Sequence, residues 1–141
     1  MKFPTPYNKK NVFILILILV FLASSLLFFS FKKTTIAITT IAIITATDTL
    51  VLDVAIADTP EKQMKGLMFK TELGENEGML FVFDKLDKRH FWMKNTYLPL
   101  DIIFTDENKT ILQIEYADPC REDPCKIYSS TSNAVAYVLE T

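Results

Sequence analysis

Glycine, cysteine and histidine are scarce in this chain, and their scarcity argues against several classes of function. Three glycines, two cysteines and one histidine occur among 141 residues. Three scattered glycines do not form the glycine-rich loop that cradles phosphate groups. One histidine and two cysteines are too few for a convincing four-ligand zinc site. His90 also lacks a serine in a nucleophile-elbow motif. The sequence therefore predicts no catalytic residues and no cofactor.

Charge is absent from one long stretch near the beginning of the chain. Residues 11–31 contain no charged side chain and consist almost entirely of Ile, Leu, Val and Phe. At roughly 1.5 Å per residue, this stretch would span about 30 Å as a helix, the thickness of the hydrocarbon core of a bilayer. We expect a cytoplasmic tail at 1–10 and a transmembrane signal-anchor at 11–31, with the lipid bilayer as a partner.

Lysines on both sides of this stretch indicate its orientation. Three lysines and the amino terminus precede it and two lysines follow it, so the positive-inside rule favours a cytoplasmic N-terminus and an extracytoplasmic C-terminal domain. The apolar run is longer than that of a usual signal peptide, and no clear small-x-small cleavage site follows closely. We expect a single-pass protein of the cell membrane; a cleaved signal and a cytoplasmic domain are the alternatives.

The remainder of the chain is acidic and contains both cysteines. Residues 34–141 hold ten basic and 17 acidic residues, a net charge of −7, which argues against nucleic acid as a partner. Cys120 and Cys125 are each preceded by proline and separated by four residues. So short a loop can close a disulfide, worth about 2 kcal/mol by chain entropy. Two free thiols are the alternative; a disulfide would favour an oxidising compartment.

Alternating and β-branched segments predict a mainly β domain. Thr59, Pro60 and Gly66 are typical of the cap, first turn and end of one short helix. We predict an α+β domain, mainly β, built as a small barrel-like or strongly bent antiparallel sheet with one short helix and preceded by the transmembrane helix. The expected segments are a linker or first strand at 32–47 and a domain at 48–141, with strands at 49–57, 79–83, 90–96 and 134–140 and a hairpin of 100–105 with 110–116.

Three segments of this region together resemble a known family. They are Gly66-Leu67-Met68, the apolar run from Gly78 to Phe83, and Phe91-Trp92-Met93-Lys94-Asn95-Thr96 followed by Pro99-Leu100-Asp101-Ile102-Ile103-Phe104. Their order and spacing resemble the DUF192 (UPF0127) family of uncharacterised, often membrane-anchored or secreted proteins. The resemblance covers roughly residues 48–140 and implies a compact β-rich fold, but it supplies no function.

The resemblance also shows a departure at the C-terminus. Relatives usually continue beyond the Val-Leu-Glu strand to a further turn and strand, whereas this chain ends at Thr141. We therefore expect either a fragment or a short variant with an exposed edge at the place where the further strand would pair.

Polar residues within the apolar strands form the first candidate site. Asp101 interrupts an apolar strand, so we expect it to be half-buried and to need a partner, with Lys94 the natural candidate and Asn95 the second. A structural ion pair is one interpretation. The other is a small polar pocket in which Trp92, Lys94, Asn95 and Asp101 bind a small ligand or an envelope protein.

Methionines form the second candidate site. Met68, Met79 and Met93, together with His90, offer the soft ligands that suit Cu(I). The alternative is that these methionines simply fill gaps in the core. We therefore expect a membrane-anchored binding domain, with a copper-handling protein as the alternative and an envelope enzyme of unrecognised type as the third hypothesis.

Overall fold

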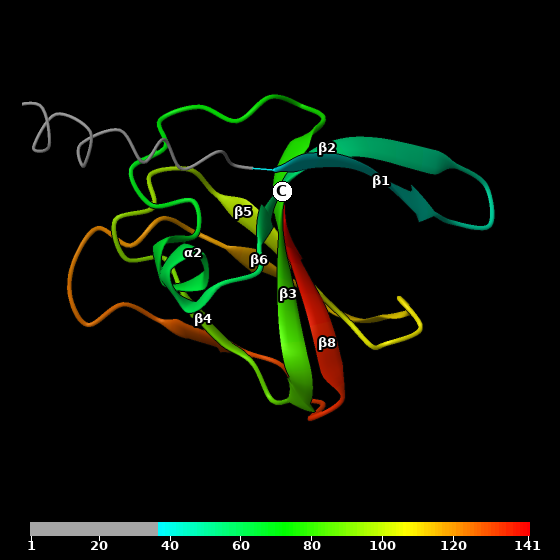
Figure 1. Ribbon diagram of the computed structural model, residues 1–141. Coiled ribbons are helices and arrows are strands. Elements are labelled where there is room, and N and C mark those ends of the chain that lie inside the picture. Colours follow the sequence, from blue (N-terminus) through cyan, green and yellow to red (C-terminus); the bar gives the residue numbers. More distant parts are fainter. Residues whose placement is uncertain (1–36) are drawn as a thin grey trace, which may run out of the picture. The chain divides into compact units, whose positions relative to one another are not determined.

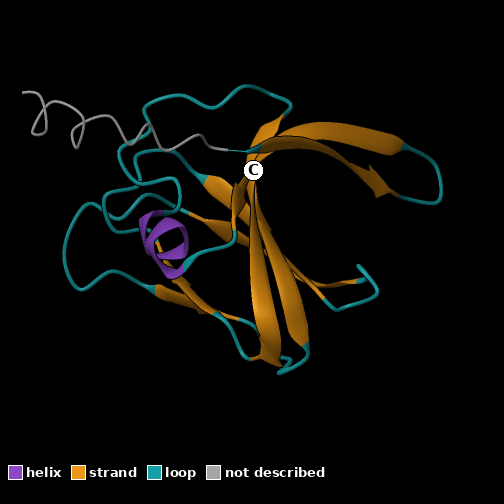
Figure 2. Ribbon diagram, viewed as in Figure 1, coloured by secondary structure: helices purple, strands orange, loops and turns teal. Residues whose placement is uncertain are grey.

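The computed structural model describes residues 37–141, which contain eight strands and one short helix (Figures 1 and 2). In chain order these are β1 (Ile38–Ile44), β2 (Thr49–Ala57), α2 (Pro60–Lys65), β3 (Glu77–Asp87), β4 (His90–Trp92), β5 (Leu100–Thr105), β6 (Ile111–Ala117), β7 (Ile127–Ser129) and β8 (Val135–Glu140). A mainly β fold with one short helix is therefore confirmed for this part of the chain.

Six of the strands form one mixed sheet in the order β1-β2-β3-β8-β5-β6, and β4 pairs with β7 in a separate ribbon. The prediction of an antiparallel sheet is wrong at one position, because β2 and β3 run parallel. Parallel neighbours need a crossover connection, and the segment containing α2 supplies it. The other pairs in both sheets are antiparallel.

The large sheet is bent and open, so the barrel-like alternative is wrong and the bent-sheet alternative is confirmed. Figure 1 shows the β1–β2 hairpin curving away from the long β3–β8 pair. The two edge strands are β1 and β6. The last strand, β8, is not at an edge, because it lies between β3 and β5 and pairs with both.

Helix α2 begins and ends where the local sequence predicts. Thr59 caps it, since its hydroxyl accepts a hydrogen bond from the backbone N–H of Lys62, and Pro60 occupies the first turn. Gly66 ends it with φ +48°, a conformation that favours glycine. Outside the helix, Asp58 pairs with Lys62, and the bond lowers the pKa of the Asp58 carboxyl.

Alternation along the strands separates two clusters of buried side chains. Phe81, Ile102 and Val138 belong to the larger cluster, whereas Leu139 and Ile103, next to them in sequence, belong to a smaller cluster that β1 and β2 complete. Since successive residues of a strand point to opposite faces, the sheet separates two apolar layers. Figure 2 shows α2 and β4 on the same side of the long β3–β8 pair.

Several segments differ from the sequence predictions in extent. The strand expected at 90–96 ends at Trp92, because Asn95 adopts φ +57° and its carbonyl accepts a hydrogen bond from the Phe69 N–H. The expected hairpin is confirmed as β5 and β6. The predicted membrane helix at 11–31 lies outside the described residues. Within residues 37–141, no helix has the length and apolar character that crossing a membrane requires.

Candidate functional site

A carboxyl group is buried at the end of the central strand of the sheet. Glu140 is the last residue of β8 and lies between Met79 of β3 and Ile102 of β5. It is 5% exposed, and burial raises the pKa of its carboxyl to about 8. Among the described residues, no ion pair includes it. A buried acid without a charged partner costs stability, so its presence at this position points to a role beyond folding.

The end of α2 covers this carboxyl group. A Cβ atom added at Gly66 would lie 3.6 Å from Oε2 of Glu140 and 3.3 Å from Cζ of Phe81, so the glycine backbone lies directly against both side chains. Gln63 fixes the helix to β3 by donating a hydrogen bond of 2.7 Å to the Val82 carbonyl. Glu140 and the end of the helix line a small, partly open cavity of about 30 Å³. The other residues lining it are Gln63, Met64, Lys65, Gly66, Leu67, Met68, Phe81, Phe91, Trp92 and Thr96.

A wider cleft of about 350 Å³ adjoins this cavity. Five lining residues are common to both hollows: Gln63, Met64, Phe81, Phe91 and Trp92. Phe91 meets Phe81 edge to face, with ring centroids 5.0 Å apart. We call the two hollows together the Glu140 cleft. It has a buried acid at one end and an aromatic wall shared along its length.

Basic residues line the other end of the Glu140 cleft. The Arg89 guanidinium carbon lies 3.8 Å from the centroid of the Phe83 ring, and one guanidinium nitrogen donates to the Lys85 carbonyl. Its Nε is buried without a hydrogen-bond partner, and burial lowers the pKa of the side chain. Lys88 and His90 also line this end. The cleft is therefore polar at both ends and aromatic between them.

His90 does have a serine neighbour, which the sequence did not reveal. Its Nδ1 lies 2.7 Å from Oγ of Ser129, because the two residues face each other across the β4–β7 pair. No carboxylate forms an ion pair with His90 among the described residues. Without an acid to orient the imidazole, the pair is a cross-strand hydrogen bond and lacks the third member of a triad.

The predicted pairing of Lys94 with Asp101 is wrong. Lys94 instead binds Asp123 of the cysteine loop, with Nζ 3.1 Å from Oδ2. Asp101 is exposed, not half-buried, because it lies near the open end of β5 opposite Tyr116, which is itself 61% exposed. Its backbone exchanges two hydrogen bonds with Thr141.

The predicted polar set is therefore only partly assembled. Trp92 lines the Glu140 cleft, and Lys94 Nζ lies 5.7 Å from the centroid of the Trp92 ring. Asn95 is exposed at the turn that ends this segment. A ligand-binding role for these residues stays a prediction, with Trp92 best placed to have one.

The methionine set occupies several environments. Met93 is 1% exposed in the larger core cluster, and Met79 packs against that cluster. Met68 lines the small cavity beside Glu140, whereas His90 is exposed on β4. Metal binding by these residues stays a prediction, and Met79 and Met93 have packing roles that account for them.

The two cysteines form the expected pair. Cys120 and Cys125 are joined in a disulfide, with Cα atoms 5.5 Å apart. Asp123 lies close to both sulfur atoms, but thiols joined in a disulfide do not offer the thiolates that bind metal ions.

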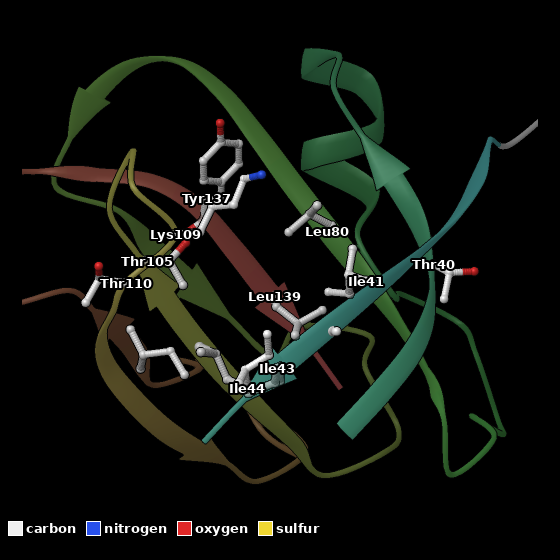
Figure 3. Close-up of a pocket in the computed structure, with 13 residues that line it drawn as sticks. Thr40, Ile41, Ile43, Ile44, Leu80, Thr105, Lys109, Thr110, Tyr137 and Leu139 are labelled. Carbon is white, nitrogen blue, oxygen red and sulfur yellow. The ribbon is translucent and has the colours of Figure 1, made fainter. Parts of the chain in front are cut away.

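A larger hollow lies on the opposite face of the sheet. It is a groove of about 650 Å³ that we call the β1 groove (Figure 3). Figure 3 shows Ile41 and Ile43 of β1 facing Leu80 and Leu139 across it. Lys109 is the charged residue among those that line it. The groove is large and mostly apolar, and Lys109 and Tyr137 are the ionisable residues that line it.

Glu140 is the functional candidate that the sequence reasoning missed. Asp101 is predicted to be half-buried because it is an acid in an apolar strand. Glu140 is also an acid in an apolar strand, and it is the one that is buried. By strict alternation it shares a face with Val138, which is fully buried. An acid at an inward position of a strand was the signal that could have revealed it.

The fold and the cleft define a class: a small mixed-sheet domain with one crossover helix and a buried acid beside a single tryptophan. Comparison with known proteins then assigns the family. The model of the DUF192 family, described as "Uncharacterized ACR", matches residues 42–141. The chain belongs to this family, as its sequence resemblance indicated.

Two crystal structures share the fold at substantial identity. One, from Novosphingobium aromaticivorans DSM 12444, is described as a protein of unknown function; it is 34% identical, with a TM-score of 0.70 over 77% of this chain and 76% of that chain. The other, from Sinorhizobium meliloti 1021, is described as "a putative transcription regulator"; it is 39% identical, with a TM-score of 0.70 over 77% of this chain and 83% of that chain. No curated protein matches the sequence.

Proposed function

We propose that this protein is a binding domain that takes a small ligand in the Glu140 cleft. The observation that carries the proposal is the buried carboxyl group of Glu140, which faces a cavity and forms no ion pair within residues 37–141. Folding alone gains nothing from such a group. Small-ligand sites are typically apolar hollows with a few placed polar groups, and the Glu140 cleft has that composition.

The segments that carry the family resemblance support the same location. Gly66, Leu67 and Met68 come from the first segment, Phe81 from the second, and Phe91, Trp92 and Thr96 from the third; all line the cavity beside Glu140. These segments are far apart in the sequence and meet at this cavity. The β1 groove draws Leu80 and Ile103 from these segments, against seven residues in the cavity, which favours the Glu140 cleft as the shared site.

A fragment screen tests the proposal. Trp92 is the only tryptophan, so its fluorescence reports directly on the cleft. Met64→Ser and Ile44→Ser are a matched pair, because both side chains are exposed (70% and 78%) and line the Glu140 cleft and the β1 groove respectively. We expect Met64→Ser to weaken the binding of fragments that change Trp92 fluorescence, and Ile44→Ser to leave it unchanged. If the binding of fragments were weakened only by Ile44→Ser and not by Met64→Ser, the proposal would be contradicted.

We further propose that residues 11–31 tether the domain to the outer face of the cell membrane. The uncharged 21-residue stretch and the disulfide-closed loop support this placement. In intact cells, a membrane-impermeant maleimide should label Cys120 and Cys125 only after reduction, and the protein should remain in the membrane after an alkaline wash. Free cysteines shielded from the reagent would contradict it.

The Sinorhizobium protein is described as "a putative transcription regulator", but the charge of this chain argues against nucleic acid as its partner. Residues 34–141 carry an excess of seven acidic residues, and a surface of that charge repels the phosphate backbone. The acidic balance supports a small ligand or an envelope protein over nucleic acid.

A further inference from the structure

We propose, resting on the proposed function of the Glu140 cleft, that its ligand carries a primary ammonium group which enters the small cavity and pairs with the Glu140 carboxylate. The rest of the ligand would lie along Trp92 in the wider cleft. The class of ligand is thus an organic primary amine with an apolar body.

Charge is the first argument. The neighbours of Glu140 on β3 and β5, Met79 and Ile102, are apolar. Lys65 of α2 is the other charged residue that lines the small cavity, and the described ion pairs do not join it to Glu140. Among residues 37–141, the Glu140 carboxyl group therefore has no ion-pair partner. An ammonium ion supplies a counter-charge and donates hydrogen bonds to the carboxylate oxygens.

Size is the second argument. The cavity of about 30 Å³ beside Glu140 exceeds the roughly 10–15 Å³ that one water molecule needs, but it is far smaller than the adjoining cleft. It admits a primary ammonium group more readily than a trimethylammonium group, which has three more carbon atoms. The adjoining cleft of about 350 Å³ has room for an aromatic or aliphatic body.

The walls are the third argument. Phe81, Phe91 and Trp92 line both hollows, and aromatic faces attract cations through the ring quadrupole. At the far end, Lys88 and Arg89 are basic. They would repel a second positive group, so a monocation fits the cleft better than a polyamine.

Proton linkage follows from the burial of the acid. The raised pKa of Glu140, about 8, means that the free carboxyl holds its proton at neutral pH. An ammonium ion binds the ionised form, so binding releases that proton and tightens as the pH rises towards 9. Because about 1% of the carboxyl would be ionised at pH 6, we expect affinity there to be about a hundredfold weaker than at pH 9.

The experiment titrates the full chain in detergent micelles with four probes of similar shape: phenethylamine, 2-phenylethanol, 3-phenylpropionate and trimethyl(phenethyl)ammonium. We expect phenethylamine to bind at least tenfold tighter than the other three at pH 9, where Glu140 is already largely ionised, and its binding at pH 6 to release about one proton from Glu140. Glu140→Gln should remove that preference, and Ile44→Ser should preserve it. A capped Gly-Lys-Gly peptide distinguishes a lysine of a protein partner from a free amine as the source of the ammonium group.

Each outcome decides between the two proposals. Tighter binding of the alcohol or the carboxylate, lost on Met64→Ser, would overturn the ammonium assignment and leave the binding site standing. Equal binding of the quaternary probe would overturn the size argument and with it the assignment. If no probe binds at millimolar concentration, the ammonium inference fails, and the fragment screen decides separately whether the cleft binds anything.

Discussion

The Glu140 cleft and the β1 groove lie on opposite faces of one sheet, and they differ in size and in the residues that line them. The groove is the larger, at about 650 Å³, and has an apolar lining with one charged residue at Lys109. The hollow beside Glu140 is about twenty times smaller, yet it contains an acid that folding alone would exclude. By size alone the β1 groove would be the better candidate for a binding site, whereas the buried acid favours the Glu140 cleft. The chemistry is the better guide here, because an apolar groove can follow simply from the bend of the sheet.

The largest expected effect concerns the pH dependence of stability. Glu140 holds its proton up to about pH 8 in the folded chain, but only up to its ordinary value of 4.5 in the unfolded chain. Between these values folding takes up a proton, so stability falls as the pH rises. The full effect would be about 5 kcal/mol at most. Below pH 4.5 both states are protonated, and above pH 8 the loss is complete.

Glu140→Gln isolates this contribution, because glutamine has the same shape and does not titrate. We expect the free energy of unfolding of the variant to exceed that of the parent at pH 8 and to match it near pH 4.5. Urea denaturation at a series of pH values measures the difference. Equal curves at all pH values would mean that the acid is solvated, and the contrast between the two faces would then disappear.

The next effect concerns Gly78 of β3, which lies against the backbone of Glu140. A Cβ added at Gly78 would lie 2.6 Å from the backbone oxygen of Glu140, so β3 and β8 would have to move apart. We expect Gly78→Ala to cost about 3 kcal/mol, the upper range for overpacking. Gly74→Ala is the control, since its Cβ would meet only the flexible side chain of Glu77. Thermal denaturation of both variants tests this; similar losses would show that the backbone beneath Glu140 is not fixed.

A smaller effect should separate the disulfide loop from the cleft. Removing both sulfur atoms in Cys120→Ser/Cys125→Ser should cost about 2 kcal/mol of stability, because the unfolded chain regains the entropy of a short loop. Neither cysteine lines the Glu140 cleft. Binding of fragments to the cleft, followed by Trp92 fluorescence, should therefore be unchanged. If the variant also bound fragments more weakly, the cysteine loop would have to contribute to the Glu140 cleft.

Local signals explain which elements could be predicted from the sequence. Helix α2 was predictable because Thr59, Pro60 and Gly66 act within one turn of their own position. The β5–β6 hairpin was predictable because its turn is short. The parallel β2–β3 pair and the place of β8 between β3 and β5 depend on contacts between distant segments. No local pattern specifies such contacts.

The same distinction explains the errors at the candidate site. Lys94 and Asp101 are near in sequence, so pairing them was the simplest local interpretation. Lys94 instead meets Asp123, 29 residues away, because the cysteine loop folds back towards it. Glu140 meets Gly66 across 74 positions of sequence, and only the assembled sheet shows that α2 covers it.

The smallest expected effect tests which acid Lys94 binds. The ion pair between Lys94 and Asp123 is solvent-exposed, so its coupling energy should be about 0.2–1 kcal/mol. Lys94 and Asp101 make no such pair, so the effects of Lys94→Ala and Asp101→Ala should add without coupling. Two double-mutant cycles, Lys94 with Asp123 and Lys94 with Asp101, measure both values by urea denaturation. Coupling above 1 kcal/mol in the second cycle would restore the local ion pair and place a polar site at the start of β5. If the second cycle shows no coupling, Glu140 is the acid of this domain whose burial lowers stability.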